Sequence, residues 1–597
     1  MDKLRLKKSE SPPFSFCRNR TAILGILISC MFIRGCSEDF LEITPNGELD
    51  QAVLATYEGV DALLIGAYSM LDGVAEGVGA WESATSGWVF ASIRGLEGNK
   101  GTDSGDSPSG INSIQNFVER PDNPYLNIKW QATYEAISRC NSTLRVAHAA
   151  MEAGSITDEE YNSLVRQARA LRGFYHFEAW RLWADRESNL YVPYLDEYTK
   201  PNSFTNTEDI RARILEDFTE GTKLPLNMVQ VGRFNRTVCQ VFLAKALMQM
   251  YDDHESALEL LSEVVETGTN PAGQNIGLEA RYGDVFDIEF RNGLESVYTV
   301  QYSVNDGSGG WNGGMGELLN FPYKTGTSPA GCCSFFQPTQ DFVNSFRTDP
   351  MGLPYLDTYN EEMVSSDQGI HPDSAFDEYT GRLDPRLDWS VGRRGIPYWD
   401  WGEHTGEDWI RDQTYAGPYS PKKQVYKLSQ EDIYTEVGNW TSGYTANGYR
   451  MIRYADVLLL KAECEAWTAT DDLGLGEVNA VRSRAANPDG FVKEADGVSP
   501  AANYVIGLYP SFPSIRFAKK AIKFERKLEL GQEGHRYYDL QRWNNVFTEL
   551  SRILSYEKTM PWGSMMYVGG TVGPEDVNYP IPQRQIDQSK GQLVQNR

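Results

Sequence analysis

Apolar side chains recur at steps of three and four residues over several long stretches of the chain, which is the spacing of one face of an α-helix. In residues 157–183 this stripe consists of Leu164, Ala168, Leu171, Tyr175 and Leu182. Thr157 and Glu160 stand at its start and predict a capping box there. The same spacing predicts helices at residues 52–74, 125–151, 207–222, 235–251, 255–267, 450–467 and 477–486.

The predicted helices come in pairs along the first half of the chain. Residues 125–151 and 157–183 form one helical hairpin, 207–222 and 235–251 form another, and 255–267 begins a third. Helix pairs in series are typical of tetratricopeptide-like stacks, although the full consensus of that repeat is not present here. We therefore expect a mainly α fold built on a tetratricopeptide-like helical-hairpin scaffold.

Two segments rich in Gly, Asp and Trp interrupt the helical pattern, at residues 73–110 and 270–444. Within the longer one, 296–304 is β-prone and 335–346 reads as a short helix. Long irregular connections inside a compact protein are usually functional. The expected division is an N-terminal helical part at 51–269 that carries the loop 73–110, an irregular ligand-binding insertion at 270–444, and a C-terminal helical part at 445–597 that completes the scaffold.

The N-terminus carries several basic residues before an apolar run, Thr21–Ile33. This arrangement is typical of a signal peptide, and the run is shorter than the roughly 20 residues that span a membrane as a helix. A cysteine directly after such a run indicates lipoprotein processing. We expect a signal peptide at 1–35, a lipid on Cys36 and a polar tether at 36–50, with Cys30 as the alternative because Leu27-Ile28-Ser29-Cys30 is the better lipobox.

The net charge of −26 and the pI near 4.8 argue against a nucleic-acid partner, because phosphates would be repelled over most of the surface. Beyond the leader no two cysteines have C-x-x-C spacing, so no zinc or redox motif is predicted. Cys140, Cys239 and Cys464 lie within helical patterns and are expected to be buried free thiols. The adjacent Cys332 and Cys333 have no role that the sequence assigns.

Motifs of catalysis and cofactor binding are missing from the sequence. The six histidines form no H-E-x-x-H, and there is no Walker A loop, no G-x-G-x-x-G and no G-x-S-x-G. The sequence thus gives no support for nucleotide binding, a metalloprotease or the usual hydrolase site, and no cofactor or metal is predicted. A calcium site that uses Asp103 and Asp106 is conceivable, although their spacing is not that of an EF-hand loop. A glycosidase needs only two well-placed carboxylates, so a secreted glycoside-active enzyme stays open as an alternative.

Tryptophans in glycine-rich or polar loops are the strongest candidates for ligand binding. They fall in three groups: Trp81 and Trp88, then Trp311, then Trp399, Trp401 and Trp409. An indole on a flexible loop offers a flat face to the C–H face of a sugar ring, while the hydroxyls seek polar side chains. Polar partners are expected among Arg94, Asn99, Lys100, Asp103, Asp106 and Asn312. The competing interpretation is ordinary, since tryptophan is highly buried on average and loop polar residues are usually solvated.

The densest run of charged and aromatic residues is Glu525–Asn544, in which acids and arginines are expected to pair with one another and lock two short helices together. Its segments ERKLEL and EGHRYYDLQRW resemble the C-terminal signature of the SusD/RagB family of outer-membrane, glycan-binding lipoproteins. Residues 167–177, 453–463 and 579–587 also resemble that family, and so does the acidic segment that begins at Cys36.

This resemblance implies a cell-surface lipoprotein without catalytic activity. Such a protein captures oligosaccharides at the outer membrane and delivers them to a partner, a SusC-like TonB-dependent transporter. The segment Ile93–Leu96 departs from the Ala-Ser-Asp-Asp that similar chains show there, which weakens the transfer of polar contacts at that point and indicates a different glycan. A helical-repeat scaffold that binds only protein is a further alternative.

Overall fold

The structure is a computed structural model that describes residues 54–75, 80–106, 109–185, 187–200, 203–323, 328–329, 332–438 and 441–597. All of them belong to one compact unit, Leu54–Arg597. The predicted signal peptide, both candidate lipidation sites, Cys30 and Cys36, and the tether lie outside the described residues.

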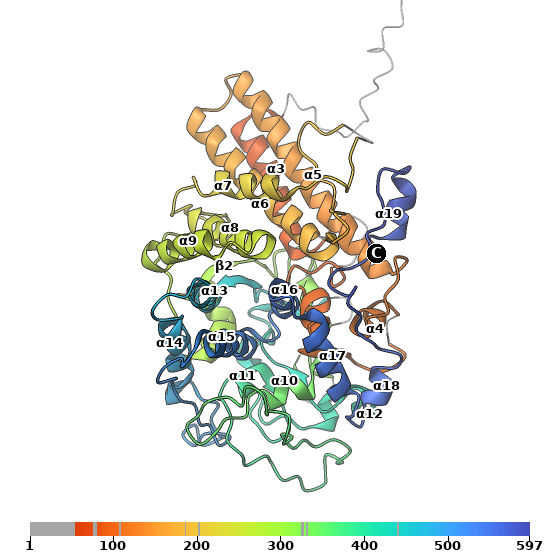
Figure 1. Cartoon of the computed structure of the whole chain (residues 1–597), viewed down its shortest axis with the longest axis vertical. Helices are drawn as coiled ribbons and strands as arrows, with labels where there is room; N and C mark the ends of the chain where they lie inside the picture. Colours follow the sequence, from red (N-terminus) through yellow and green to blue (C-terminus); the bar gives the residue numbers. More distant parts are fainter. Residues whose placement is uncertain are drawn as a thin grey trace, which may run out of the picture. The chain divides into compact units, whose positions relative to one another are not determined.

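Antiparallel helix pairs make up the first half of this unit, as the periodicity predicts (Figure 1). In chain order, the helices and helical turns of this part, apart from η3 (Trp88–Ile93), are α3 Tyr57–Ser69, η2 Met70–Asp72, α4 Ser109–Gln115, α5 Pro124–Glu152, α6 Asp158–Trp183, α7 Arg211–Gly221, α8 Arg236–Tyr251 and α9 His254–Thr267. From α5 to α9 each helix packs against the next one, and α3 lies against α5 and α6. The mainly α fold is confirmed, and the closer likeness to tetratricopeptide repeats stays a prediction.

The capping box predicted before α6 is present. Thr157 Oγ1 accepts a hydrogen bond from the N–H of Glu160 at 3.3 Å, and the N–H of Thr157 donates to Glu160 Oε2 at 2.8 Å. Two N–H groups that the first helical turn leaves without partners are thereby satisfied. This local signal fixes the start of the second helix of the first hairpin.

A second set of helices follows the insertion. It comprises α13 Tyr454–Trp467, α14 Leu475–Ala485, η9 Pro488–Gly490, α15 Ile515–Leu530, α16 Arg536–Arg542, α17 Val546–Glu557, α18 Gly563–Met566 and α19 Gln583–Gln588. Helix α13 contacts both α9 and α15, so the C-terminal helices pack onto the end of the first series. The predicted helix at 450–467 begins only at Tyr454, because Arg450–Arg453 form a strand, β8, that pairs with residues far away in the sequence.

Short strands and single helical turns make up the insertion and its contacts. Four antiparallel pairs are present among the described residues: β1 Gly98–Gly101 with β3 Phe335–Pro338, β2 Ser296–Thr299 with β8, β4 Val391–Gly392 with β5 Ser420–Pro421, and β6 Thr435–Glu436 with β7 Tyr444–Thr445. The helical turns are η3 Trp88–Ile93, η4 Tyr282–Phe286, η5 Ile288–Phe290, η6 Met315–Glu317, α10 Gln340–Asn344, α11 Leu387–Ser390, η7 Glu407–Trp409, α12 Gln413–Ala416 and η8 Leu428–Gln430. The predicted strand in 296–304 is confirmed at β2, whereas the segment 335–346 divides into β3 and α10.

The charged run at Glu525–Asn544 forms the expected network, and it is buried. Glu529 pairs with Arg453 at 2.6 Å, with Arg386 at 2.8 Å and with Arg484. Burial alone would raise the pKa of Glu529, but the three guanidinium groups hold it well below its usual range. Every partner is also nearly inaccessible to solvent. The network ties α15 to β8, to the residue that precedes α11, and to α14.

Candidate functional site

Trp311 is the most exposed of the predicted tryptophans, with 62% of its surface accessible. It lies at the tip of a loop that Asp306 closes: Asp306 Oδ2 accepts hydrogen bonds from Ser303 at 2.5 Å and from the Asn312 side chain at 2.8 Å. The N–H of Ser308 donates to Asp306 Oδ1 at 2.9 Å. These bonds give the loop a defined shape while the indole stays in solvent.

The base of this loop is held by the hairpin β6–β7. The N–H of Asn305 donates to Glu436 at 2.8 Å, and the N–H of Gly314 donates to the carbonyl of Thr445 at 2.9 Å. Gly310 has φ +89°, and a Cβ at this position would come within 2.5 Å of the Tyr444 ring. Only glycine therefore fits this close approach, which explains the glycine-rich sequence beside Trp311.

A cleft of 290 Å³ opens next to the loop, and Asn312 and Ser303 belong to its wall. Helix α3 and the turn after it form the other wall with Tyr68, Ser69 and Asp72, and the chain after β2 adds Gln301 and Tyr302. We call this cleft, together with the adjoining Trp311, the Trp311 cleft. Its chemistry is that of aromatic faces beside hydroxyl, amide and carboxyl groups, which is what a hydroxyl-rich ligand needs.

Asp72 is the acid of the Trp311 cleft. Burial raises its pKa to about 7, against the lowering effects of a hydrogen bond from the N–H of Val74 and of the nearby Arg139. Burial likewise raises the pKa of Tyr302 well above its usual value. At neutral pH this wall therefore presents a hydroxyl group and a partly protonated carboxyl group. The sequence prediction missed Gln301, Tyr302 and Asp72, because nothing in their local pattern separates them from ordinary helix and strand ends.

The first pair of predicted tryptophans divides into two roles. Trp88 is 1% exposed, and its Nε1–H donates to the carbonyl of Gly316 at 2.9 Å. Trp88 therefore supports η6, the turn that follows the loop of Trp311, and its burial corrects the expectation that it contacts a ligand. Trp81 is half-buried against the core, and its neighbour Ala80 shares an apolar cluster with Met315 and Tyr444, so the two loops adjoin.

Three predicted polar residues are buried and satisfied inside the protein, which corrects their assignment as ligand contacts. Arg94 pairs with Glu119 at 2.7 Å and Asp576 at 3.1 Å, and these acids raise its pKa although burial lowers it. Asn99 lies in strand β1, and its side chain donates to the carbonyl of Ala416 at 3.1 Å. Lys100 Nζ donates to the carbonyls of Asp103 and Asp106 at 2.9 and 2.7 Å.

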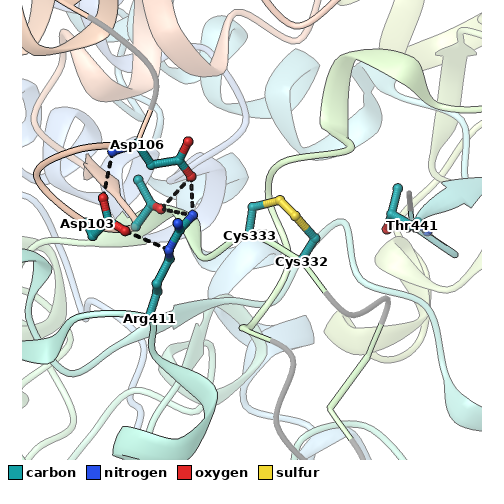
Figure 2. Close-up of a disulfide and its surroundings, with 8 residues drawn as sticks. Asp103, Asp106, Cys332, Cys333, Arg411 and Thr441 are labelled. Atoms are coloured by element: carbon teal, nitrogen blue, oxygen red, sulfur yellow. Dashed lines mark hydrogen bonds and ion pairs between the residues drawn. A yellow bond between two sulfur atoms is a disulfide. The ribbon is translucent and has the colours of Figure 1, made fainter. Parts of the chain in front are cut away.

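Asp103 and Asp106 face Arg411, whose guanidinium lies 2.8 Å from Asp103 and also contacts Asp106 (Figure 2). Arg411 thus already pairs with the two carboxylates that a calcium ion would need as ligands. Next to them the adjacent Cys332 and Cys333 form a disulfide, and the following Ser334 accepts from the N–H of Thr102 at 2.5 Å. Cys140, Cys239 and Cys464 are buried free thiols, as expected.

The third tryptophan group forms part of the core of the insertion. Trp409 and Trp401 are buried in one cluster with Tyr398 and Tyr426, and the Trp401 Nε1–H donates to the carbonyl of Tyr426 at 2.8 Å. Trp399 is half-buried and packs against Trp389 with ring centroids 5.1 Å apart. Burial removes Trp401 and Trp409 from the candidate ligand contacts, whereas Trp399 stays a candidate.

A larger cleft of 330 Å³ lies between the end of α6 and the C-terminal segment, where none of the predicted residues occur. Its two arginines are engaged with neighbours: Arg597 pairs with Asp576 at 2.9 Å, and Arg181 packs over the ring of Tyr538 at 3.9 Å. Trp180 on its wall is only 3% exposed. We therefore take the smaller Trp311 cleft as the candidate functional site, because the exposed Trp311 directly precedes Asn312, which lies on its wall.

Comparison with known proteins agrees with this architecture. Among solved structures, a SusD superfamily protein from Bacteroides vulgatus matches with a TM-score of 0.64 at 18% identity, over 91% of this chain and 98% of that one. Surface glycan-binding protein A from Bacteroides thetaiotaomicron, in complex with laminarihexaose, matches with a TM-score of 0.60 at 21% identity, over 91% and 99%. The same-named protein from Bacteroides uniformis matches with a TM-score of 0.62 at 20% identity, again over 91% and 99%.

At these identities the structural likeness establishes the fold alone. The family model of the SusD family matches residues 294–597, half of the chain. The chain therefore belongs to the SusD family. No curated protein sequence matches it.

Proposed function

We propose that this protein is a glycan-binding protein of the cell surface, and that the Trp311 cleft binds the glycan. The observation that carries the proposal is an exposed indole held by a hydrogen-bonded loop at the edge of a polar cleft. A similar structure, surface glycan-binding protein A from Bacteroides thetaiotaomicron, holds laminarihexaose. Shared family membership makes the same ligand class the first to test here.

Binding would combine stacking with a few directed hydrogen bonds. The face of a sugar ring packs on Trp311, while Asn312, Gln301 and Asp72 offer amide and carboxyl groups to its hydroxyls. Because ordering a flexible oligosaccharide offsets much of this gain, we expect affinities on the order of micromolar to millimolar.

The proposed role is capture without cleavage. Glycoside hydrolysis ordinarily uses two carboxyl groups on either side of the scissile bond. Among the described residues that line the Trp311 cleft, Asp72 is the only acid. This supports a binding protein over the secreted glycoside-active enzyme that the sequence alone leaves open.

The test of capture without cleavage runs the purified protein through native gels that contain a polysaccharide, beginning with a β-glucan such as laminarin. We expect retention on at least one polysaccharide and no new reducing ends after prolonged incubation. Reproducible release of reducing ends, abolished by replacing Asp72 with Asn, would establish the enzyme instead. Retention on no glycan, together with specific capture of a protein, would favour the helical-repeat interaction scaffold.

Surface anchoring through a lipid on Cys36 is part of the same proposal. In the described part of the chain, no helix is both long enough and apolar enough to cross a membrane. We expect Cys36→Ala to release the protein from the membrane fraction and Cys30→Ala to leave it there. The reverse result would assign the lipid to Cys30.

The proposed partner is a SusC-like TonB-dependent transporter, which would receive the captured oligosaccharide at the outer membrane. The support is family membership. Co-purification of such a transporter with the tagged protein from detergent-solubilised outer membranes tests it. A tagged protein that emerges free of any TonB-dependent transporter under conditions that preserve other outer-membrane complexes would contradict it.

A further inference from the structure

A second cleft, of 250 Å³, lies between helices α15, α16 and α17 and the segment 356–359. Its walls carry five cationic side chains, namely Lys520, Lys523, Lys527, Arg536 and Arg552. Such a concentration stands out in a chain with a net charge of −26. We call it the basic cleft.

Helical geometry explains how the sequence gathers these cations. Lys520, Lys523 and Lys527 are spaced by three and four residues along α15, so they share one face of that helix. The turn after α15 brings Arg536 at the start of α16 back to this face, and Arg552 reaches it from α17. The basic cleft is thus built by the same charged region that the sequence analysis singled out, on its outer side.

Carboxylates neutralise only part of this charge. Asp341 accepts from Lys527 at 2.6 Å and from Arg552 at 3.2 Å, while Glu549 pairs with Arg552 at 2.9 Å and with Arg536 at 3.1 Å. Lys520 at the rim pairs with Asp357. Four of the five cations thus form ion pairs with three carboxylates, and the fifth forms none among the described residues.

Lys523 is the cation without an ion-pair partner among the described residues. It is half-buried, its Nζ lies 4.9 Å from the centre of the Trp543 ring, and burial lowers its pKa, with Arg536, Arg542 and Lys519 adding to the effect. Glu463 acts in the opposite direction, but Arg542 already pairs with it at 2.7 Å. A cation that is desolvated beside other cations is in an unfavourable position that a bound anion would relieve.

Arg536 supplies an independent indication of a ligand. This residue is 6% exposed and lines the cleft, and its Nε has no hydrogen-bond acceptor among the described residues. Its one ion pair, to Glu549, engages Nη2 at 3.1 Å, on the same edge of the guanidinium group as Nε. A buried donor without a partner costs free energy, and a negative charge in the cleft would offset part of that cost.

We propose that the basic cleft binds the carboxylate or sulfate group of an acidic saccharide between Lys523 and Arg536, with the half-buried Trp543 beside it. The cleft lies below the range of about 300–1000 Å³ typical of sites for larger ligands, so it takes one charged sugar unit. The two cations are recessed, which suits an inserted group better than a flat membrane surface. The proposal rests on the proposed function only in taking the ligand to be a saccharide, and it concerns a different site.

The test measures binding of two acidic probes, trigalacturonic acid and a sulfated disaccharide, by calorimetry at constant ionic strength. We expect at least one of them to bind the wild-type protein, and Lys523→Gln to weaken that binding by about tenfold. Arg536→Gln should weaken it in the same direction. Lys223→Gln removes an exposed lysine that pairs only with Glu220 at the surface, and this matched control should bind as the wild type does.

Failure of both probes to bind overturns the proposal, as does equal binding by the wild type and Lys523→Gln. Attachment of the wild type to phosphatidylglycerol vesicles, lost in Lys523→Gln and without binding of either saccharide, would assign the basic cleft to a membrane and also overturn it. Retention on a neutral polysaccharide through the Trp311 cleft should be the same in Lys523→Gln and the wild type. The two proposals can therefore fail separately.

Discussion

The network around Glu529 and the loop around Trp311 use polar side chains in opposite ways. Around Glu529, carboxylates and guanidinium groups are all buried and all paired, so the polar groups join secondary structures that are distant in the sequence. Around Trp311, Asp306 organises only its own loop, and the aromatic side chain is left in solvent. In the first region the polar side chains stabilise the fold, whereas in the second they shape an exposed loop.

This difference teaches how to weigh charged and aromatic residues in such a chain. A dense run of acids and arginines looks catalytic, yet here every partner is a fixed ion, which is how a structural network perturbs pKa values. A lone tryptophan among glycines carries no charge, yet it is the side chain that is exposed to solvent. The predictions that follow are ordered by their expected effect on stability, from the largest to none.

Glu529→Gln should have the largest effect. The substitution leaves Arg453, Arg386 and Arg484 without their shared carboxylate in a buried setting, at a cost of about 3–5 kcal/mol. We expect a much lower midpoint in denaturant titrations. Glu220→Gln at the exposed pair with Lys223 is the matched control, and it should change the free energy of unfolding by less than about 1 kcal/mol. Equal midpoints for both variants would show that the network does not stabilise the fold.

Trp88→Phe should have an intermediate effect. It keeps most of the aromatic packing but leaves the carbonyl of Gly316 without its 2.9 Å hydrogen bond, which costs about 1–3 kcal/mol. Because this bond fixes η6, which directly follows the loop of Trp311, cleavage of that loop by a protease should also become faster in the variant. Unchanged stability together with lost glycan retention would mean that Trp88 meets the ligand after all.

Asp72→Asn should have an effect that depends on pH. The folded-state pKa of Asp72 is raised from 3.8 to about 7, so the folded protein keeps a proton that the unfolded chain has lost. The stability contributed by this group is therefore present below about pH 4 and declines by about 1.4 kcal/mol for each pH unit up to about pH 7. In Asp72→Asn this decline should disappear from unfolding curves measured between pH 4 and 8. A variant with the same slope as the wild type would show that Asp72 titrates normally.

The helices were predictable from sequence because their signals are local. The apolar stripe of α6 and its capping pair Thr157 and Glu160 lie within one turn or one face of the same helix. The errors fall where a distant partner decides the structure. Arg450–Arg453 continue a helical pattern but pair as β8 with β2, and the polar segment Gly98–Gly101 becomes the buried strand β1 because β3 lies beside it.

The candidate site was predictable only in part for the same reason. Trp311 and Asn312 stand out because the glycines around them mark an exposed loop. Trp88 and Trp409 have a similar local setting, and only the packing of the whole chain shows that they are buried. The tertiary fold brings Asp72 and Tyr302 to the Trp311 cleft, and no sequence motif predicts their position there.

The most direct test of the account compares Trp311→Ala with the wild type and with Tyr198→Ala, which removes a different aromatic side chain that is 72% exposed. For a glycan that the wild type retains, affinity and unfolding midpoint are measured on the same samples. Trp311→Ala should leave the stability within about 0.5 kcal/mol of wild type. It should weaken binding by about tenfold or more, as expected for the loss of a stacking partner. Tyr198→Ala should match the wild type in both measurements. Unchanged affinity in Trp311→Ala, with the fold intact, would contradict the claim that this exposed tryptophan binds the glycan.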